Sequence, residues 1–82
     1  MATTGGFQAP RRYRRSERYA KFLNRLKQAR EEAGLTQTDA GKRLGVPASF
    51  ISKSERGERR VDALEFWDFA RLYRKPFAYF FR

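Results

Sequence analysis

The chain has 82 residues, 40% of them hydrophobic, which is enough for one domain with one small core and excludes a multidomain enzyme. It contains no Cys and no His, so disulfides, thiol catalysis, imidazole bases and Cys/His zinc sites lack their groups, and we expect neither a metal nor a cofactor. Nineteen Lys and Arg against nine Asp and Glu give a formal net charge of +10, which attracts polyanions and makes nucleic acid the leading expected partner.

The first part of the chain differs in character from the rest. Residues 1–10 are small, Gly-rich and without periodicity, so we assign them no structure. Five arginines follow at a density that repels itself unless an anion lies alongside: Arg11, Arg12, Arg14, Arg15 and Arg18. This stretch is either a solvated tail or an arm that lies on phosphates or in a minor groove, and we favour the arm. We therefore predict a flexible basic arm over 1–15 and a folded domain over 16–82.

A first helix is expected from Ser16, which can act as its cap, to Gly34, which can end it. Apolar residues recur between them at threes and fours, the pattern of an amphipathic helix. Arg30 projects into the apolar stripe, where an unpaired charge would be costly. Glu55 is the natural partner, and the alternative is that Arg30 reaches water along its methylene stem. The spacing alone leaves both open.

Two short helices joined by a tight turn, a helix-turn-helix, are expected next. Thr36 followed by Asp39 predicts a capped helix that begins near Gln37. Gly45 and Pro47 then interrupt the helical pattern and place the turn between the two helices.

The helix after this turn is expected to have two different sides. Ala48, Ile51 and Glu55 share one side, which faces inward. The outward side, the candidate reading face, holds Ser49, Phe50, Ser52 and Lys53. Gly57 suits a left-handed helix stop. The arginines around this stop are expected to be exposed and to hold backbone phosphates: Arg56, Arg59 and Arg60.

A fourth helix is expected from Asp62, which with Glu65 repeats the cap pattern. Its broad apolar stripe is predicted to be core: Ala63, Phe66, Trp67, Phe69, Ala70 and Tyr73. After Pro76, residues 77–81 are predicted to form a short terminal helix or turn. The stripe and the terminal segment together give more apolar surface than one small core needs. The C-terminal aromatic region therefore either folds back onto the helices or pairs with a second copy of the chain.

The run from 77 to 81 is also the longest wholly apolar stretch. It is far shorter than the roughly 20 residues that cross a bilayer, and no stretch resembles a secretory signal. We therefore expect no membrane association and a cytoplasmic location.

Four short motifs stand in a recognisable order and spacing: GLTQ at 34–37, RLGV at 43–46, ISK at 51–53 and ERGER at 55–59. Through them about two thirds of the chain resembles the Cro and phage-repressor type of helix-turn-helix, the xenobiotic-response-element (XRE) family of bacterial regulators. The resemblance implies an all-α, compact four- to five-helix bundle of the lambda repressor-like type, whose third helix enters the DNA major groove. It also implies that Arg30 pairs with Glu55.

Candidate roles can be assigned to single residues. The resemblance places Gln37 on a phosphate and against the recognition helix. Bases or flanking phosphates are expected to face Ala48, Ser49, Phe50, Ser52 and Lys53. Backbone phosphates are expected to be held by Gln37, Arg43, Arg56, Arg59 and Arg60. The sequence departs from the family's pattern at Ala40-Gly41, at Ser54 and at the small pair Ala48-Ser49, so direct readout should be sparse.

We interpret the chain as a sequence-specific regulator of transcription that binds double-stranded DNA, a repressor that occupies its operator as a homodimer. Lys53 would donate to guanine, and Phe50 would pack on a thymine methyl group. One alternative is an antitoxin or restriction-modification controller that binds its own promoter and also a protein partner. Another is an RNA-associated or bridging module without sequence preference. An enzyme is least expected, because the acidic residues serve as helix caps or in the buried pair.

Overall fold

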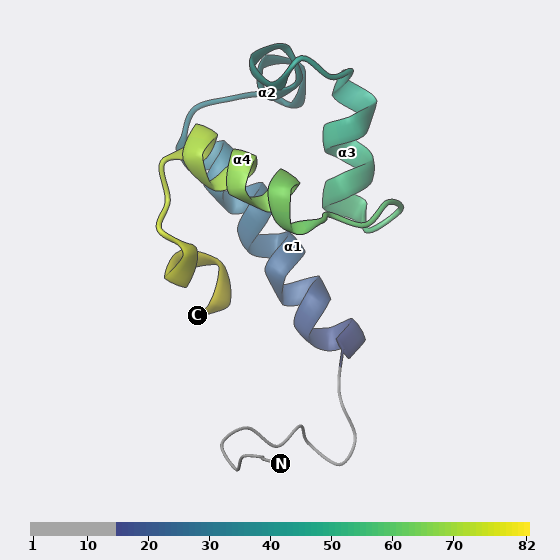
Figure 1. The fold of residues 1–82 in the computed structure, drawn as a ribbon, viewed down its shortest axis with the longest axis vertical. Helices are drawn as coiled ribbons and strands as arrows, with labels where there is room; N and C mark the ends of the chain where they lie inside the picture. Colours follow the sequence, from purple (N-terminus) through teal and green to yellow (C-terminus); the bar gives the residue numbers. More distant parts are fainter. Residues whose placement is uncertain (1–14) are drawn as a thin grey trace.

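The computed structural model describes residues 15–82, which form four α-helices and one 3-10 helix (Figure 1). In chain order they are α1 (Arg15–Glu32), α2 (Gln37–Leu44), α3 (Ala48–Arg56), α4 (Ala63–Tyr73) and η1 (Phe77–Phe81). The described residues contain no strand, so the predicted all-α class is confirmed. Among them, no helix is long and apolar enough to cross a membrane.

The start of α1 differs slightly from the prediction. The helix begins at Arg15, so Ser16 lies inside its first turn and is not its cap, because a cap residue lies outside the helix that it caps. Arg11, Arg12 and Arg14 fall outside the described residues. The division into a basic arm and a folded domain therefore stays a prediction.

The start of α2 and the turn after it follow from local sequence. Thr36 Oγ1 accepts the Asp39 amide hydrogen at 3.0 Å, and the Asp39 carboxylate accepts the Thr36 amide hydrogen at 3.0 Å. This capping box confirms the predicted start of α2. Gly45 ends the helix with φ of 76°, a left-handed conformation that favours glycine. A Cβ atom on Gly41 would lie 2.6 Å from the Val46 carbonyl oxygen, so glycine lets the α2–α3 turn lie close to α2.

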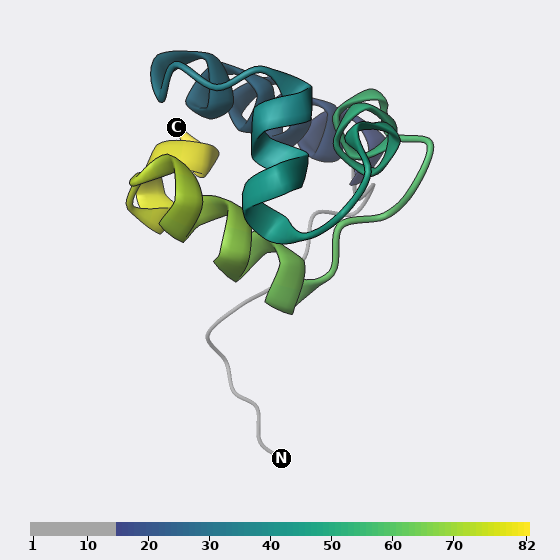
Figure 2. The same ribbon diagram turned by 90° about the horizontal axis from the view of Figure 1, so that it is seen from above.

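The core forms around α1. That helix packs against α3, α4 and η1, while α2 packs against α3 and α4. Figure 2 shows α3 and η1 on opposite sides of the molecule. Side chains that are almost fully buried come from all five elements, among them Leu26, Ala40, Ile51, Phe69 and Phe80. The C-terminal aromatic region thus folds back in part, and α3 is left with one side on the core and one side free.

The apolar stripe of α4 is wider than the face that its neighbours cover. Ala63 and Trp67 were predicted to be core, but both are exposed, Trp67 to 49%. Leu64 is exposed between them. Leu72, which falls outside the predicted stripe, packs against the core. Phe77 and Phe81 of η1 are also exposed. An uncovered apolar surface therefore remains on α4 and η1.

Candidate nucleic-acid interface

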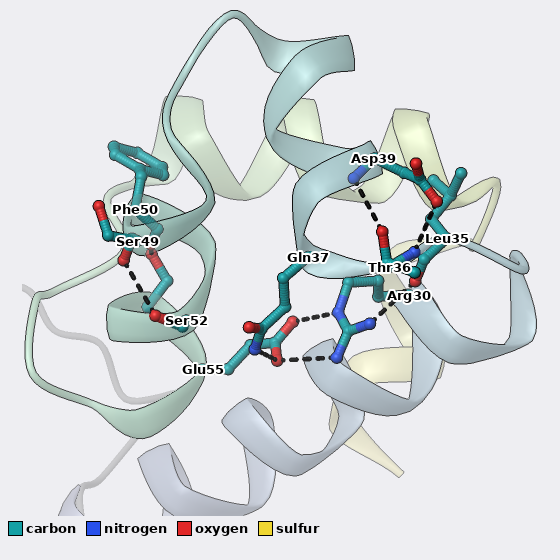
Figure 3. A network of polar contacts seen from close by, with 10 residues as sticks. Arg30, Leu35, Thr36, Gln37, Asp39, Ser49, Phe50, Ser52 and Glu55 are labelled. Carbon is teal, nitrogen blue, oxygen red and sulfur yellow. Dashed lines mark hydrogen bonds and ion pairs between the residues drawn. The ribbon is translucent and has the colours of Figure 1, made fainter.

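A buried ion pair ties α3 to α1. Arg30 Nε donates to Glu55 Oε2 at 2.6 Å, and Arg30 Nη2 donates to Glu55 Oε1 at 3.1 Å (Figure 3). The two side chains are only 9% and 4% exposed. The hydrogen bond to Glu55 raises the pKa of Arg30 against the opposing effect of burial. The pair expected from the sequence is therefore present, with the two-pronged geometry that arginine and a carboxylate favour.

The same pair also fixes the start of α2. Arg30 Nη1 donates to the Leu35 carbonyl oxygen at 2.8 Å. Gln37 Nε2 donates to Glu55 Oε1 at 3.1 Å, so Gln37 contacts α3 from the first residue of α2 (Figure 3). An amide nitrogen carries two hydrogens, and the second is available to another acceptor. One network therefore sets α1, α2 and α3 relative to one another.

A tyrosine hydroxyl lies within electrostatic reach of this network. The Tyr73 hydroxyl is buried, and among residues 15–82 it finds no hydrogen-bond partner. Burial raises the pKa of Tyr73, and the negative charge of Glu55 raises it further. The hydroxyl is therefore held neutral next to the pair.

The side of α3 away from Glu55 presents small polar groups. Ser49 and Lys53 are exposed, and Ser52 is half-buried. Ser52 Oγ donates to the Ser49 carbonyl oxygen at 3.3 Å, and both serines point away from the buried pair (Figure 3). Of the predicted reading residues, the structure brings these three together, while Ala48 at the start of the helix is half-buried.

Phe50 was predicted to point outward, and this orientation is wrong. Its ring is half-buried and packs against the core. The ring centroids of Phe50 and Phe69 lie 6.5 Å apart. On its other side, Arg59 Cζ lies 3.9 Å from the Phe50 centroid. Burial of an apolar ring is more favourable in free energy than its exposure to water, so the Phe50 ring packs towards α4. The Arg59 guanidinium covers its other face.

Arg59 was predicted to be an exposed phosphate ligand, but its guanidinium is already engaged. Arg59 Nη1 donates to Glu65 Oε1 at 3.0 Å and to Ser54 Oγ at 3.1 Å, and Nη2 donates to Glu65 Oε2 at 2.8 Å. The hydrogen bonds between Arg59 and Glu65 raise the pKa of Arg59 and lower that of Glu65. One feature of the sequence was a signal for this arrangement: Ser54 stands where the family pattern has an apolar residue.

Exposed cations precede and follow the middle of α3 along the chain. Arg43 is exposed at the end of α2, as is its neighbour Lys42, which the sequence analysis did not select. Arg56 is exposed and pairs with Glu58 at 2.8 Å. Arg60 lies over the Tyr19 ring, with Cζ 4.8 Å from the centroid. A helix with a polar free face and cations near both ends has the groups that DNA bases and phosphates require.

Comparisons with known proteins agree with this geometry. A family model described as helix-turn-helix matches residues 26–80. A solved structure of an XRE-family-like protein from Pseudomonas syringae pv. tomato str. DC3000 is 45% identical, with a TM-score of 0.74. The match covers 79% of this chain and 80% of that chain. No curated protein sequence matches the chain.

Proposed function

This chain belongs to the XRE-type helix-turn-helix family, and from that membership we propose that it regulates transcription by binding double-stranded DNA in a sequence-specific manner. In this proposal α3 enters the major groove, and the protein acts as a repressor that occupies its operator as a homodimer. The helix-turn-helix domain is a DNA-binding fold, which favours a regulator over an enzyme.

The observation that carries the proposal is the two-sided nature of α3. Ile51 and Ser54 are fully buried on its inner side, and Glu55 is held there by Arg30. Ser49 and Lys53 are exposed on the other side. A helix anchored so firmly on one side can present the other to base edges without moving when it binds.

Phosphate contacts would supply most of the affinity. Exposed cations stand at the end of α2, at the end of α3 and in the loop after α3: Lys42, Arg43, Arg56 and Arg60. Gln37 can give its second amide hydrogen to a phosphate while the first stays on Glu55. Arg59 is a weaker candidate, because its donors already face Glu65 and Ser54. The affinity should therefore fall steeply with salt concentration.

Selection of bound duplexes from a random pool tests the proposal directly. We expect the pool to converge on one motif, arranged as an inverted repeat with half-sites about one helical turn apart. In that motif, Lys53→Ala should weaken binding by about 1 to 3 kcal/mol and relax the preference at one base pair. Arg43→Met is the matched control and should weaken binding to all duplexes alike. A pool that fails to converge would contradict sequence-specific binding.

The basic arm gives a separate prediction. Deleting residues 1–14 removes Arg11, Arg12 and Arg14 but none of the described core. The shortened protein should fold normally, bind DNA more weakly and lose roughly 0.9 from its log-log salt slope for each phosphate contact removed. Duplexes with A·T-rich flanks should show the larger loss if the arm enters the minor groove. Equal slopes for both proteins would identify the arm as a solvated tail.

The homodimer would form through the exposed apolar surface on α4 and η1. We call this surface the apolar patch; its residues are Leu64, Trp67, Phe77 and Phe81. Its aromatic rings are connected. The Phe77 ring lies 4.9 Å from Phe66 and 5.7 Å from Trp67, and the Phe81 ring lies 5.8 Å from Phe66, between ring centroids. A second copy is the expected occupant, because a two-fold axis would place two α3 helices on an inverted repeat.

Sedimentation equilibrium of the parent protein and of Trp67→Ser tests the dimer. The parent should be dimeric and the variant monomeric, with both folded. A parent that stays monomeric even on its selected duplex would contradict the homodimer. A parent that co-purifies with a different protein, and loses it in Trp67→Ser, would favour the antitoxin or controller alternative.

A further inference from the structure

Arg59 joins two helices across the loop that separates them. Phe50 and Ser54, which it contacts on one side, belong to α3. Glu65, which it contacts on the other, belongs to the first turn of α4. We call these four residues the Arg59 clamp. It is the counterpart, on the α4 side, of the network by which Arg30 holds α3 to α1.

Each partner of Arg59 is itself held in place. Ser54 is fully buried, and its Oγ donates to the Phe50 carbonyl oxygen at 2.7 Å. Glu65 Oε1 also accepts the Asp62 amide hydrogen at 3.0 Å, as part of the capping box of α4. The Phe50 ring rests on Phe69, which is 1% exposed. The Arg59 guanidinium is therefore held by groups on both helices, and these contacts would have to break before it could bind a phosphate.

The reading residues lie next to the clamp along α3. Ser49 directly precedes Phe50, and Ser52 and Lys53 directly precede Ser54. Because a helix fixes successive residues about 100° apart, a turn of α3 about its axis that moved Phe50 off Phe69 would turn these three side chains by the same angle. The rotation of α3 about its own axis is therefore tied to the position of the Phe50 ring.

We propose that Arg59 is a positioning residue for sequence readout: it sets the rotation of α3 by holding Phe50 against α4 and makes no phosphate contact of its own. The proposal rests on the proposed DNA-binding function. It assigns Phe50 the role of a fixed stop between Arg59 and Phe69. Base contacts then come from Ser49, Ser52 and Lys53.

The planar fork of arginine distinguishes this role from a phosphate contact. Lysine keeps the positive charge but cannot donate two parallel hydrogen bonds to Glu65 or lie flat on Phe50. A phosphate contact tolerates lysine, since a point charge is enough to hold a phosphate. Arg59→Lys and Arg59→Met should therefore behave alike if Arg59 is a clamp and differently if it holds a phosphate.

The experiment measures the affinity of full-length variants for the selected duplex and for a scrambled duplex as a function of salt. Arg59→Lys and Arg59→Met should each lose about 10-fold on the selected duplex, the order of one lost base contact, and far less on the scrambled one. Their salt slopes should equal that of the parent. Arg60→Met is the matched control, because Arg60 is an exposed arginine of the same loop. It should lose affinity on both duplexes and lower the slope by roughly 0.9.

Two results of this binding experiment would overturn the clamp. If Arg59→Lys keeps the parent affinity while Arg59→Met loses on both duplexes with a lower slope, Arg59 holds a phosphate. If both variants melt at a lower temperature but, per folded molecule, keep the full preference for the selected duplex, Arg59 only stabilises the fold. Should the Arg59 variants fold poorly, Ser54→Ala removes one acceptor of the clamp and should show the same loss of preference in weaker form.

A measurement without DNA distinguishes a failure of the clamp proposal from a failure of the proposed DNA-binding function. The ring-proton signals of Phe50 should shift in Arg59→Lys, because the planar guanidinium over the ring is lost, and should stay in place in Arg60→Met. Unchanged Phe50 signals in Arg59→Lys would overturn the clamp whatever the DNA results. Shifted signals together with a parent that binds all duplexes alike would instead overturn sequence-specific binding.

Discussion

Two arginine–glutamate pairs help to hold α3, one against α1 and one against α4, and they differ in burial. Arg30 and Glu55 join α1 to α3 with side chains that are 9% and 4% exposed. Arg59 and Glu65 join the α3–α4 loop to α4 with side chains that are 29% and 24% exposed. Both arginines donate two hydrogen bonds to one carboxylate. The chemistry is the same, and the access of water is not.

That difference predicts different consequences when each pair is broken. A charge left alone in a dry interior is costly, because neither water nor a counter-charge stabilises it. A charge left alone at a half-exposed site is solvated and screened, so its loss costs little stability. The Arg30–Glu55 pair should therefore control whether the domain folds. The Arg59–Glu65 pair, on our proposal, controls how α3 is presented.

The largest expected effect comes from the buried pair. Glu55→Gln keeps the size of the side chain but leaves Arg30 without a carboxylate. We expect the free energy of unfolding to fall by about 3 kcal/mol, as for other buried pairs that lose one partner. Chemical denaturation at neutral pH measures it directly.

The matched control for this change is Glu58→Gln. Glu58 pairs with Arg56 at 2.8 Å, but both side chains are more than half exposed. Its removal should leave the unfolding free energy almost unchanged, because solvent screens an exposed pair. If the two variants lose equal stability, burial does not distinguish the pairs and the comparison fails.

Local sequence was sufficient to predict those parts of the site that depend on fixed spacing. The capping boxes of Thr36 with Asp39 and of Asp62 with Glu65 were predicted because each needs only a cap residue and an acceptor three positions later. Predicting Glu55 as the partner of Arg30 needed more than local spacing. Helical spacing showed that both side chains face inward, and only the family resemblance decided between pairing and exposure.

The other parts depend on how α3 is rotated against α4, which spacing cannot give. Phe50 lies at the edge between the two sides of α3, so a small rotation decides whether it faces DNA or Phe69. Arg59 could be assigned a partner only once the loop had brought it over the start of α4. Trp67 was misassigned because its helix carries more apolar residues than one small core can cover.

The second effect concerns the half-exposed pair and should be smaller. Glu65→Gln keeps an acceptor for the Asp62 amide but removes the charge next to Arg59. We expect a loss of about 1 kcal/mol or less at neutral pH. Thermal denaturation of parent and variant across a pH series measures both this loss and its pH dependence.

The pH dependence follows from the lowered pKa of Glu65, which its hydrogen bond to Arg59 causes. A carboxyl with a lower pKa in the folded state stabilises the fold above its ordinary pKa, and that stability is lost as the pH falls through the folded value. The difference between parent and Glu65→Gln should therefore be constant near neutrality and shrink below about pH 4. A difference that does not change with pH would show that the charge of Glu65 contributes nothing to stability.

The smallest expected effect tests whether the Arg30–Glu55 pair stabilises the fold without help from the Tyr73 hydroxyl. The Tyr73 hydroxyl is buried within reach of the charges on Glu55 and Arg30, yet among residues 15–82 it has no hydrogen-bond partner. Tyr73→Phe removes the hydroxyl and keeps the ring that stacks on Phe69, with centroids 5.8 Å apart. Because no hydrogen bond is lost and a buried polar group is removed, stability should change by about 0.5 kcal/mol or less, or increase. A loss as large as that of Glu55→Gln would mean that Tyr73 belongs to the network, and the contrast between the two pairs would then reflect three residues on the α1 side instead of two.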